Sequence, residues 1–254
     1  IVAYKVHPEY PLLIAANRDE SYQRPTRQAE FWDNEPSILA GQDLEKGGSW
    51  LGMNKFGSVA AVTNYRSGEK LKLSNTSRGL LVSDYLKYKK SSLNFLDLCL
   101  TKLADFEAFN LLLGDVNALY FLNSREKTYM QLEAGIYGVS NGDLDSNWPK
   151  VERAKQKMQT LLDTEQFNSH EEILLTLADK YLPDDESLPD TGMGIEWERA
   201  LAPIFIREND YGTRSSSVVR INNENRVYFT ERSYDRQGNT ANTKQFEFTI
   251  EEQE

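Results

Sequence analysis

The chain has 254 residues, with 29 lysines and arginines against 39 aspartates and glutamates, so its formal net charge is −10 and its isoelectric point is near 4.9. This acidic balance argues against nucleic acid and anionic membrane surfaces as partners, because both select basic protein faces. We predict a single domain over residues 1–254, long enough to bury a core. No apolar run approaches the ~20 residues that span a bilayer, so membrane insertion is not expected.

Cys99 is the only cysteine, which excludes an internal disulfide and a thiolate metal cluster and favours a reducing, cytoplasmic setting. The apolar spacing around it is helical and predicts an inert thiol in the core. His7 and His170 are the only histidines, so a histidine-based triad or metal site has little material. We expect neither a metal nor another cofactor.

The first elements are strands that pair as hairpins. Residues 1–6 and 11–16 are apolar runs joined by a turn that contains Pro8. Residues 21–45 are polar and contain prolines and aromatics, and we predict an ordered loop over a site. A second hairpin and a pair of amphipathic helices follow, over residues 49–53, 58–63, 77–89 and 92–104.

The rest of the chain repeats this order of strands and helices. Four strands are predicted, over residues 109–113, 118–122, 129–132 and 135–140. Pro149 starts a helix over residues 149–162, and a capped start at Ser169 begins a second helix that ends near Tyr181. An acidic loop over residues 183–194 precedes the last three strands, over residues 215–221, 226–232 and 245–250.

Groups of strands separated by helix pairs are typical of the α+β class. We predict a four-layer αββα sandwich, in which two mainly antiparallel sheets pack together and the helix pairs lie outside them. Periodicity leaves a single sheet with helices on one face open as an alternative.

Four polar residues directly follow the apolar run of residues 11–16: Asn17, Arg18, Asp19 and Glu20. A strand that leaves the core into such a tetrad can deliver chemistry at its end, and the first hairpin brings the start of the chain near it. Because side chains alternate along a strand, Asn17 and Asp19 share one face, which we predict to enter a site between the sheets. Arg18 and Glu20 would then lie on an outer, structural face. The alternative is a solvated turn with a weak Arg18–Glu20 pair.

Other strand ends carry similar groups. Asn64 follows the second hairpin, Asn141 follows the strand at residues 135–140, and Arg214 precedes the strand at residues 215–221. Asparagine offers a backbone N–H and a side-chain NH2, which are donors that an oxyanion needs. Each of these residues taken alone also suits an ordinary turn or surface position. Trp50, after two glycines, could line a pocket or simply enter a strand.

Five motifs occur in order along the chain and together resemble the NRDE family, which is also called the transport and Golgi organisation 2 family. They are Asn-Arg-Asp-Glu at 17–20, Gly-Gly-Ser-Trp-Leu-Gly at 47–52, Thr-Asn-Tyr-Arg at 63–66, Gly-Val-Ser-Asn at 138–141 and Gly-Thr-Arg at 212–214. The resemblance covers residues 1 to about 220. It implies the N-terminal nucleophile hydrolase fold, which is the same αββα sandwich.

Members of this family usually begin with Met-Cys and an apolar strand, whereas this sequence begins at the strand, with Ile1. The resemblance therefore implies a cysteine directly before Ile1. Such a cysteine would carry a thiol and a free α-amine that can serve as its base, so that no histidine is required.

A more distant similarity to choloylglycine and penicillin V acylases implies catalytic roles for four residues. Asp19 would orient the α-amine or thiol. Asn64 would contribute its backbone N–H, and Asn141 its side-chain NH2, to an oxyanion site, while Arg214 would steady the nucleophile. Ala16 stands where those acylases have an arginine on the first strand, which is a departure from their pattern.

These inferences predict a C–N amide hydrolase that acts on a small molecule, with Asn17, Trp50 and Tyr65 contacting the substrate. The alternative is a non-catalytic carrier of the same fold whose pocket holds a haem, acyl or lipid ligand. A metal hydrolase built on Asp19 and Glu20 is disfavoured, because histidine ligands are missing and the two carboxylates diverge on a strand.

Overall fold

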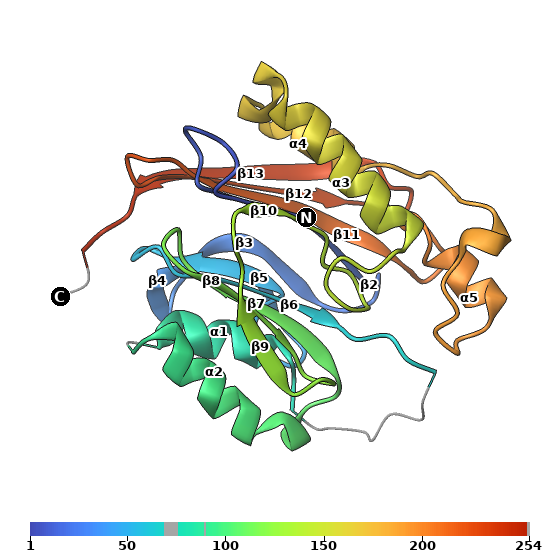
Figure 1. The fold of residues 1–254 in the computed structure, drawn as a ribbon, viewed down its shortest axis with the longest axis horizontal. Helices are drawn as coiled ribbons and strands as arrows, with labels where there is room; N and C mark the ends of the chain where they lie inside the picture. Colours follow the sequence, from blue (N-terminus) through green and yellow to red (C-terminus); the bar gives the residue numbers. More distant parts are fainter. Residues whose placement is uncertain (69–75, 89, 253–254) are drawn as a thin grey trace.

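Two antiparallel sheets pack face to face in the computed structural model, which describes residues 1–68, 76–88 and 90–252 (Figure 1). In spatial order, the strands of the first sheet are β10 (Gly135–Tyr137), β1 (Val2–Tyr4), β2 (Leu12–Ser21), β11 (Tyr211–Ile221), β12 (Arg226–Tyr234) and β13 (Thr240–Thr249). Those of the second sheet are β3 (Thr26–Trp32), β4 (Glu35–Asp43), β5 (Leu51–Asn54), β6 (Val59–Asn64), β7 (Phe109–Gly114), β8 (Leu119–Asn123) and β9 (Thr128–Gln131).

Helices cover the outer face of each sheet. The outer face of the second sheet carries α1 (Gly79–Lys87) and α2 (Ser92–Thr101), and that of the first carries α3 (Pro149–Leu162) and α4 (His170–Leu177) (Figure 1). The short α5 (Ile195–Ala200) lies beyond the ends of the strands. Single turns of 3-10 helix cover Leu103–Asp105, Glu165–Asn168 and Asp185–Ser187. The predicted α+β sandwich of four layers is confirmed.

Three apolar clusters fill the spaces between the layers. Ile14 and Met53 belong to the cluster between the sheets, Leu96 to the cluster beneath α1 and α2, and Ala15 and Met158 to the cluster beneath α3 and α4. Neighbouring residues of β2 thus enter different clusters, because side chains alternate along a strand. β2 is consequently buried on both faces.

The predicted loop over residues 21–45 is wrong, because this segment forms β3 and β4. Two register shifts, between Arg27 and Glu30 and between Phe31 and Trp32, interrupt the alternation that would have marked a strand in the sequence. A buried carboxylate holds this edge to the other sheet, since Glu231 of β12 accepts a 2.7 Å hydrogen bond from the backbone N–H of Ala29.

Smaller differences concern where elements end. β2 does not stop at Ala16 but continues to Ser21, because β11 pairs with it along its whole length. α4 ends at Leu177 rather than near Tyr181, and α5 was not predicted. The predicted end of the first helix, Lys89, lies outside the described residues. None of the helices in the described part of the chain is long and apolar enough to cross a bilayer.

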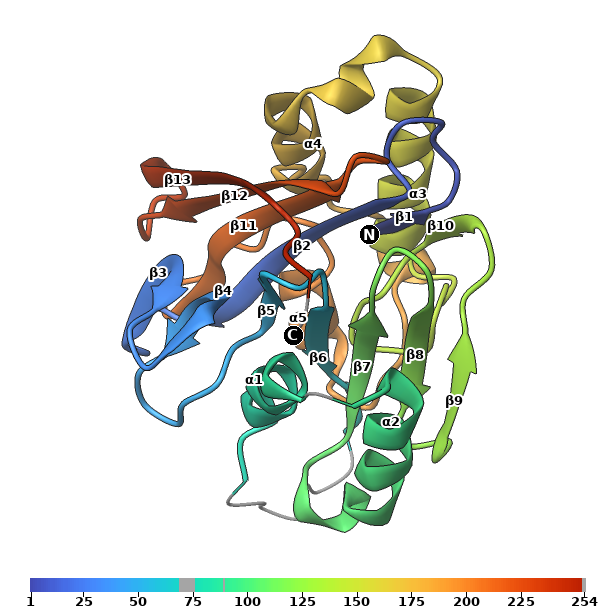
Figure 2. The same ribbon diagram turned by 90° about the vertical axis from the view of Figure 1, so that its left-hand side faces the viewer.

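The start of the chain lies beside β10 and α3 (Figure 2). The backbone nitrogen of Ile1 donates a 2.7 Å hydrogen bond to the carbonyl of Ala15, and the Ala15 N–H donates back to the Ile1 carbonyl at 2.9 Å. This pairing holds Ile1 against the same strand that carries the tetrad of residues 17–20.

Replacing Gly48 by alanine should destabilise the fold. Gly48 has φ +77°, and a Cβ there would lie 2.3 Å from the backbone of Gly79 at the start of α1. Gly194 is the matched control, since its φ is +88° and a Cβ at that residue would have no atom within 4 Å. Gly194→Ala should lower the free energy of unfolding by about 1–2 kcal/mol, and Gly48→Ala by a further ~1–3 kcal/mol for the overlap. Equal losses in urea denaturation would contradict the close contact between these segments.

Candidate functional site

A cavity of about 610 Å³ lies where the ends of several strands meet the start of α3. Six of the seven residues predicted for the site line it: Asn17, Asp19, Trp50, Asn64, Tyr65 and Asn141. Ile1 is also part of its wall, whereas Arg214 lies outside it. The structure thus brings together side chains from β2, the β4–β5 connection, the end of β6 and the segment after β10.

The tetrad divides between two faces as alternation predicts, but the faces are the reverse of those expected. Asn17 faces the helix layer, where its side-chain NH2 donates to the carbonyls of Leu177 at 2.9 Å and Ile204 at 2.8 Å. Arg18 faces the other sheet. The sequence could not decide this, because residues 12–16 are apolar on both faces of the strand. All four tetrad residues nevertheless line the cavity, which opens at the strand end.

Arg18 is a buried cation, with only 7% of the residue exposed. Its guanidinium lies 4.3 Å from the ring centroid of Trp50, and its Nη1 donates a 2.9 Å hydrogen bond to Oγ1 of Thr26. Burial lowers the pKa of Arg18 from its ordinary value. The predicted outer, structural position of Arg18 is therefore wrong: it joins the two sheets at the cavity.

Asp19 is held by β11. Its Oδ1 accepts a 2.6 Å hydrogen bond from Oγ1 of Thr213, and its carbonyl accepts one of 3.0 Å from the hydroxyl of Tyr211. Burial raises the pKa of Asp19, while the bond from Thr213 and the positive charges of Lys150 and Arg66 oppose that rise. A carboxyl group with a raised pKa in a cavity wall is suited to proton transfer.

Asn64 and Asn141 are neighbours, as the prediction of a shared site requires. The side-chain NH2 of Asn141 donates to the Asn64 carbonyl at 3.0 Å, and the Arg66 N–H donates to the Asn141 carbonyl at 2.6 Å. A third bond, of 2.7 Å, joins the Thr63 hydroxyl to the Ser140 carbonyl. These bonds fasten the segment after β10 to the end of β6.

Arg66 and Lys150 place two cations on the helix side of the cavity. Arg66 forms a buried ion pair with Glu198 of α5, with 2.9 Å between Nη1 and Oε2, and its guanidinium lies 4.9 Å from the Trp148 ring centroid. Lys150 donates from Nζ to the Leu201 carbonyl at 2.9 Å. Burial and the nearby charge of Arg66 lower the pKa of Lys150 to about 8.

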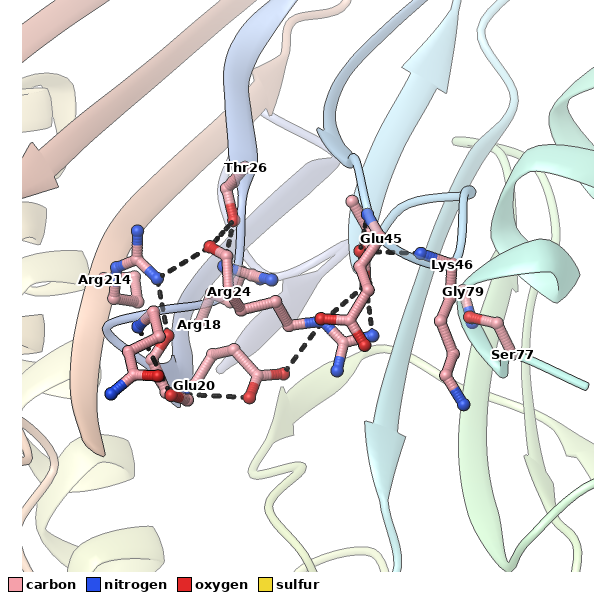
Figure 3. A network of polar contacts seen from close by, with 12 residues as sticks. Arg18, Glu20, Arg24, Thr26, Glu45, Lys46, Ser77, Gly79 and Arg214 are labelled. Atoms are coloured by element: carbon pink, nitrogen blue, oxygen red, sulfur yellow. Dashed lines mark hydrogen bonds and ion pairs between the residues drawn. The ribbon is translucent and has the colours of Figure 1, made fainter. Parts of the chain in front are cut away.

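Arg214 lies at a bulge in β11, where the pairing with β2 shifts register between Thr213 and Ser215. Its Nη1 donates to the backbone carbonyls of Ser21 at 2.6 Å and Arg24 at 3.2 Å (Figure 3). It therefore supports the turn that follows the tetrad.

An ion-pair network occupies the rim of the cavity beside this turn (Figure 3). Nη2 of Arg24 lies 2.7 Å from Oδ2 of Asp43, and its Nε lies 3.7 Å from Oε2 of Glu20. Asp43 also accepts hydrogen bonds from the backbone N–H groups of Glu45 and Lys46. The network joins the β2–β3 turn to the connection between β4 and β5.

The three residues predicted to contact the substrate, Asn17, Trp50 and Tyr65, have different surroundings. Trp50 lies under the Arg18 guanidinium, and the hydroxyl of Tyr65 donates to Asp143 at 3.0 Å. Asn17, by contrast, has its NH2 bonded to two carbonyls and its Oδ1 bonded to the Ser216 hydroxyl at 2.5 Å. Asn17 thus fixes the strand to the helix layer.

Cys99 lies on the buried face of α2, as predicted, and burial raises the pKa of its thiol to about 12. It is not part of the cavity wall. Within the described ranges, no group of three or more histidine, cysteine, aspartate or glutamate side chains is placed to hold a metal ion.

Sequence reasoning missed Thr213 and Lys150. Thr213 stands next to the arginine that we singled out, and only the bulge shows that it is the residue opposite Asp19. Lys150 follows Pro149 in the first turn of a helix, a position that normally disfavours a cation. That anomaly was the one signal in the sequence that could have marked it.

Replacing Thr213 by valine should destabilise the protein and raise the pKa of Asp19 further. The Thr213 hydroxyl donates to Asp19 and also accepts a 2.9 Å hydrogen bond from the backbone N–H of Ile206, so valine leaves two buried partners unpaired. We expect a loss of about 1–3 kcal/mol in unfolding free energy and a later carboxyl titration by ¹³C NMR. Thr213→Ser should restore both quantities. An unchanged Asp19 titration in the valine variant would contradict the assigned bond.

Several named proteins are similar to this chain over nearly all of their length. The Transport and Golgi organization protein 2 homolog of Bos taurus is 33% identical, with 92% of each chain covered. The homologue from Homo sapiens is 31% identical with 99% of each covered, and the Transport and Golgi organization protein 2 of Drosophila melanogaster is 30% identical with 87% of this chain and 86% of that protein covered.

Among solved structures, a variant of the conjugated bile acid hydrolase from Clostridium perfringens is similar, with a TM-score of 0.47 and 10% identity over 100% of this chain and 98% of that chain. The sequence model of the family described as Transport and Golgi organisation 2 matches residues 1–236. The chain therefore belongs to the Transport and Golgi organisation 2 family, also called the NRDE family.

Proposed function

We propose that the cavity is the active site of a C–N amide hydrolase whose nucleophile is a cysteine bonded to the nitrogen of Ile1. One observation carries the proposal. Ile1 lines the cavity together with Asp19, Asn64 and Asn141, and its nitrogen is fixed by the Ala15 carbonyl. A residue bonded to that nitrogen would therefore extend from the cavity wall. It would lie in the same cavity as Asp19, Asn64 and Asn141, the groups that such a reaction needs.

In this proposal the cysteine thiol loses its proton to the α-amine, and its sulfur attacks the amide carbonyl carbon. The C–N bond then breaks, the leaving amine takes up the proton, and water later hydrolyses the thioester. Asp19 orients the α-amine, and because burial raises its pKa the carboxyl group is suited to proton transfer. Thr213 holds the carboxyl group in place.

The oxyanion would lie near Asn64 and Asn141. A side-chain amide has two N–H donors. Among the described contacts, Asn141 uses one donor for the Asn64 carbonyl, which leaves the other for a developing negative charge. Arg214 has an indirect role in this proposal, because it binds the carbonyls of Ser21 and Arg24 and so supports the turn after the tetrad.

The second candidate is a carrier that binds a small ligand, such as an acyl or lipid compound or haem, without cleaving it. The hydrogen bonds that predicted site residues already make within the protein favour this candidate. Asn17 and Arg214 are hydrogen-bonded to protein carbonyls, and Asn141 is partly so. The volume of about 610 Å³ is also within the range of ordinary ligand pockets, which is roughly 300–1,000 Å³. Both candidates use the same cavity.

The hydrolase proposal predicts covalent acylation at the residue before Ile1. Protein that carries its natural N-terminal residues, processed so that the cysteine comes first, should release a stoichiometric burst of p-nitroaniline from acyl p-nitroanilides. Intact-mass spectrometry and peptide mapping should place the acyl group on the N-terminal peptide. Cys99→Ala is the matched control and should acylate normally, because that thiol is buried and protonated.

Two results would refute the hydrolase. The first is a natural sequence without a cysteine before Ile1, and the second is an absence of acylation in protein that retains a co-purified ligand. The second result would support the carrier.

Asp19→Asn separates catalysis from stability. We expect acylation to slow by a factor on the order of 10²–10⁴, because the carboxyl group is lost. Since burial raises the pKa of Asp19, the ionised form weakens the folded state above the unfolded pKa, and this cost is relieved as pH falls. The variant should thus unfold at higher urea at neutral pH. Asp33→Asn, at a carboxylate that is 97% exposed, should change neither quantity. A slower, less stable Asp19→Asn protein would indicate a structural role only.

A further inference from the structure

The cavity wall is rich in positive charge although the chain is strongly acidic. Six lining residues are basic: Arg18, Arg24, Lys46, Arg66, Arg78 and Lys150. Four are acidic: Asp19, Glu20, Asp43 and Glu107. The wall therefore carries an excess of cations in a protein whose net charge is −10. Such a local reversal of sign attracts anions into a concave, low-dielectric site.

Three of these six cations already have a carboxylate partner, and Lys46 is exposed to solvent. Arg24 pairs with Asp43 at 2.7 Å, Arg78 pairs with Glu107 at 3.2 Å, and Arg66 pairs with Glu198, which lies outside the wall. Arg18 and Lys150 are different. No carboxylate of the described residues lies within 4.0 Å of either side-chain cation, so their charges are not neutralised by direct contact.

The position of Lys150 is electrostatically unfavourable for a positive charge. It is the second residue of α3, where the helix presents positive partial charge, and Arg66 contributes further repulsion. Its Nζ donates to the Leu201 carbonyl and lies 5.9 Å from the Trp148 ring centroid. The facing carboxylates, Asp19 and Glu198, act only from a distance.

Those two carboxylates are also committed elsewhere. Asp19 accepts from Thr213, and Glu198 binds Arg66 and the backbone N–H and hydroxyl of Thr191. Neither is free to move onto Lys150. An amine that lines a cavity, without a neutralising partner and against the helix dipole, is a binding group for an anion that comes from outside.

We propose that the cavity binds an organic anion and that Lys150 is the residue that contacts its carboxylate or phosphate group. This proposal rests on the proposed function, because it takes the same cavity as the ligand site, and it adds the chemical class of the ligand. Arg18 supplies a second positive charge. It lines the cavity and is 7% exposed, and among the described contacts a single one of its five N–H donors is bonded, to Thr26.

If Lys150 contacts the anion, the affinity of the cavity for anions should decrease as pH rises. In the free protein the pKa of Lys150 is lowered to about 8 by burial and by Arg66, against the opposing charges of Asp19 and Glu198. A bound anion favours the ammonium form and raises that pKa. Affinity should therefore be constant below about pH 7 and fall by about tenfold by about pH 9, as the free amine loses its proton.

The experiment uses 8-anilinonaphthalene-1-sulfonate, a fluorescent anion that does not titrate in this range. Lys150→Met should weaken its binding at about pH 7 by about tenfold or more. Lys150→Arg should keep most of the affinity and abolish its fall above pH 8, because arginine stays charged. Lys102→Met, which removes an exposed lysine away from the cavity, should bind as the unaltered protein does.

N-phenyl-1-naphthylamine, which lacks the sulfonate, tests whether the cavity itself survives. The Lys150→Met variant should bind this neutral probe as tightly as the unaltered protein. Parallel losses for both probes would mean that Lys150 only supports the fold, and would overturn the proposal. An unchanged pH profile in Lys150→Arg would overturn it as well.

Competition identifies the anionic group. Decanoate, decyl phosphate and inorganic phosphate should be tested for displacement of the anionic probe. Displacement by decanoate indicates a carboxylate ligand, and displacement by decyl phosphate or inorganic phosphate indicates a phosphate on a chain or a free phosphate. Displacement by none of them refutes the proposal. These measurements need no catalysis, so failure of acylation with anion binding retained would refute the hydrolase alone.

Discussion

The burial of β2 on both faces is the constraint on which the site depends. Its even-numbered apolar residues pack between the sheets, and its odd-numbered ones pack under α3 and α4. Because both faces of β2 pack against other layers, its polar side chains need hydrogen-bond partners inside the protein. Asn17 therefore bonds to the helix layer, Arg18 to the second sheet and Asp19 to β11. The tetrad is the point at which three layers are joined.

The same burial shapes the electrostatics of the cavity. It raises the pKa of Asp19 and lowers that of Lys150, because each charged form is poorly solvated there. The two shifts bring an acid and an amine closer in proton affinity than they are in water. Shifts in these two directions lower the free-energy cost of moving a proton between such groups.

The sequence predicts those features of the fold and the site that depend on local patterns of residues. The αββα layers follow from apolar periodicity, and Pro149 marked the start of α3 correctly. β3 and β4 were not predicted, because bulges interrupt the alternation of apolar and polar residues along them. Alternation grouped Asn17 with Asp19 but could not choose between two buried faces, so Arg18 was placed on the wrong one. The position of Lys150 in the site depends on the cavity that the start of α3 shares with β2, more than a hundred residues earlier in the chain, and no local pattern encodes this.

The bulge in β11 shows how a short motif can act as a unit around the tetrad. A Cβ at Gly212 would lie 2.7 Å from the Ile206 carbonyl, so the backbone can approach closely only with glycine. The register shift that follows sets Thr213 opposite Asp19 and turns Arg214 toward the Ser21 and Arg24 carbonyls. One residue permits the approach, the next holds the carboxyl group, and the third supports the turn beyond it. Arg214, which stands out in the sequence, thus binds backbone carbonyls, whereas Thr213 contacts the carboxyl group of Asp19 directly.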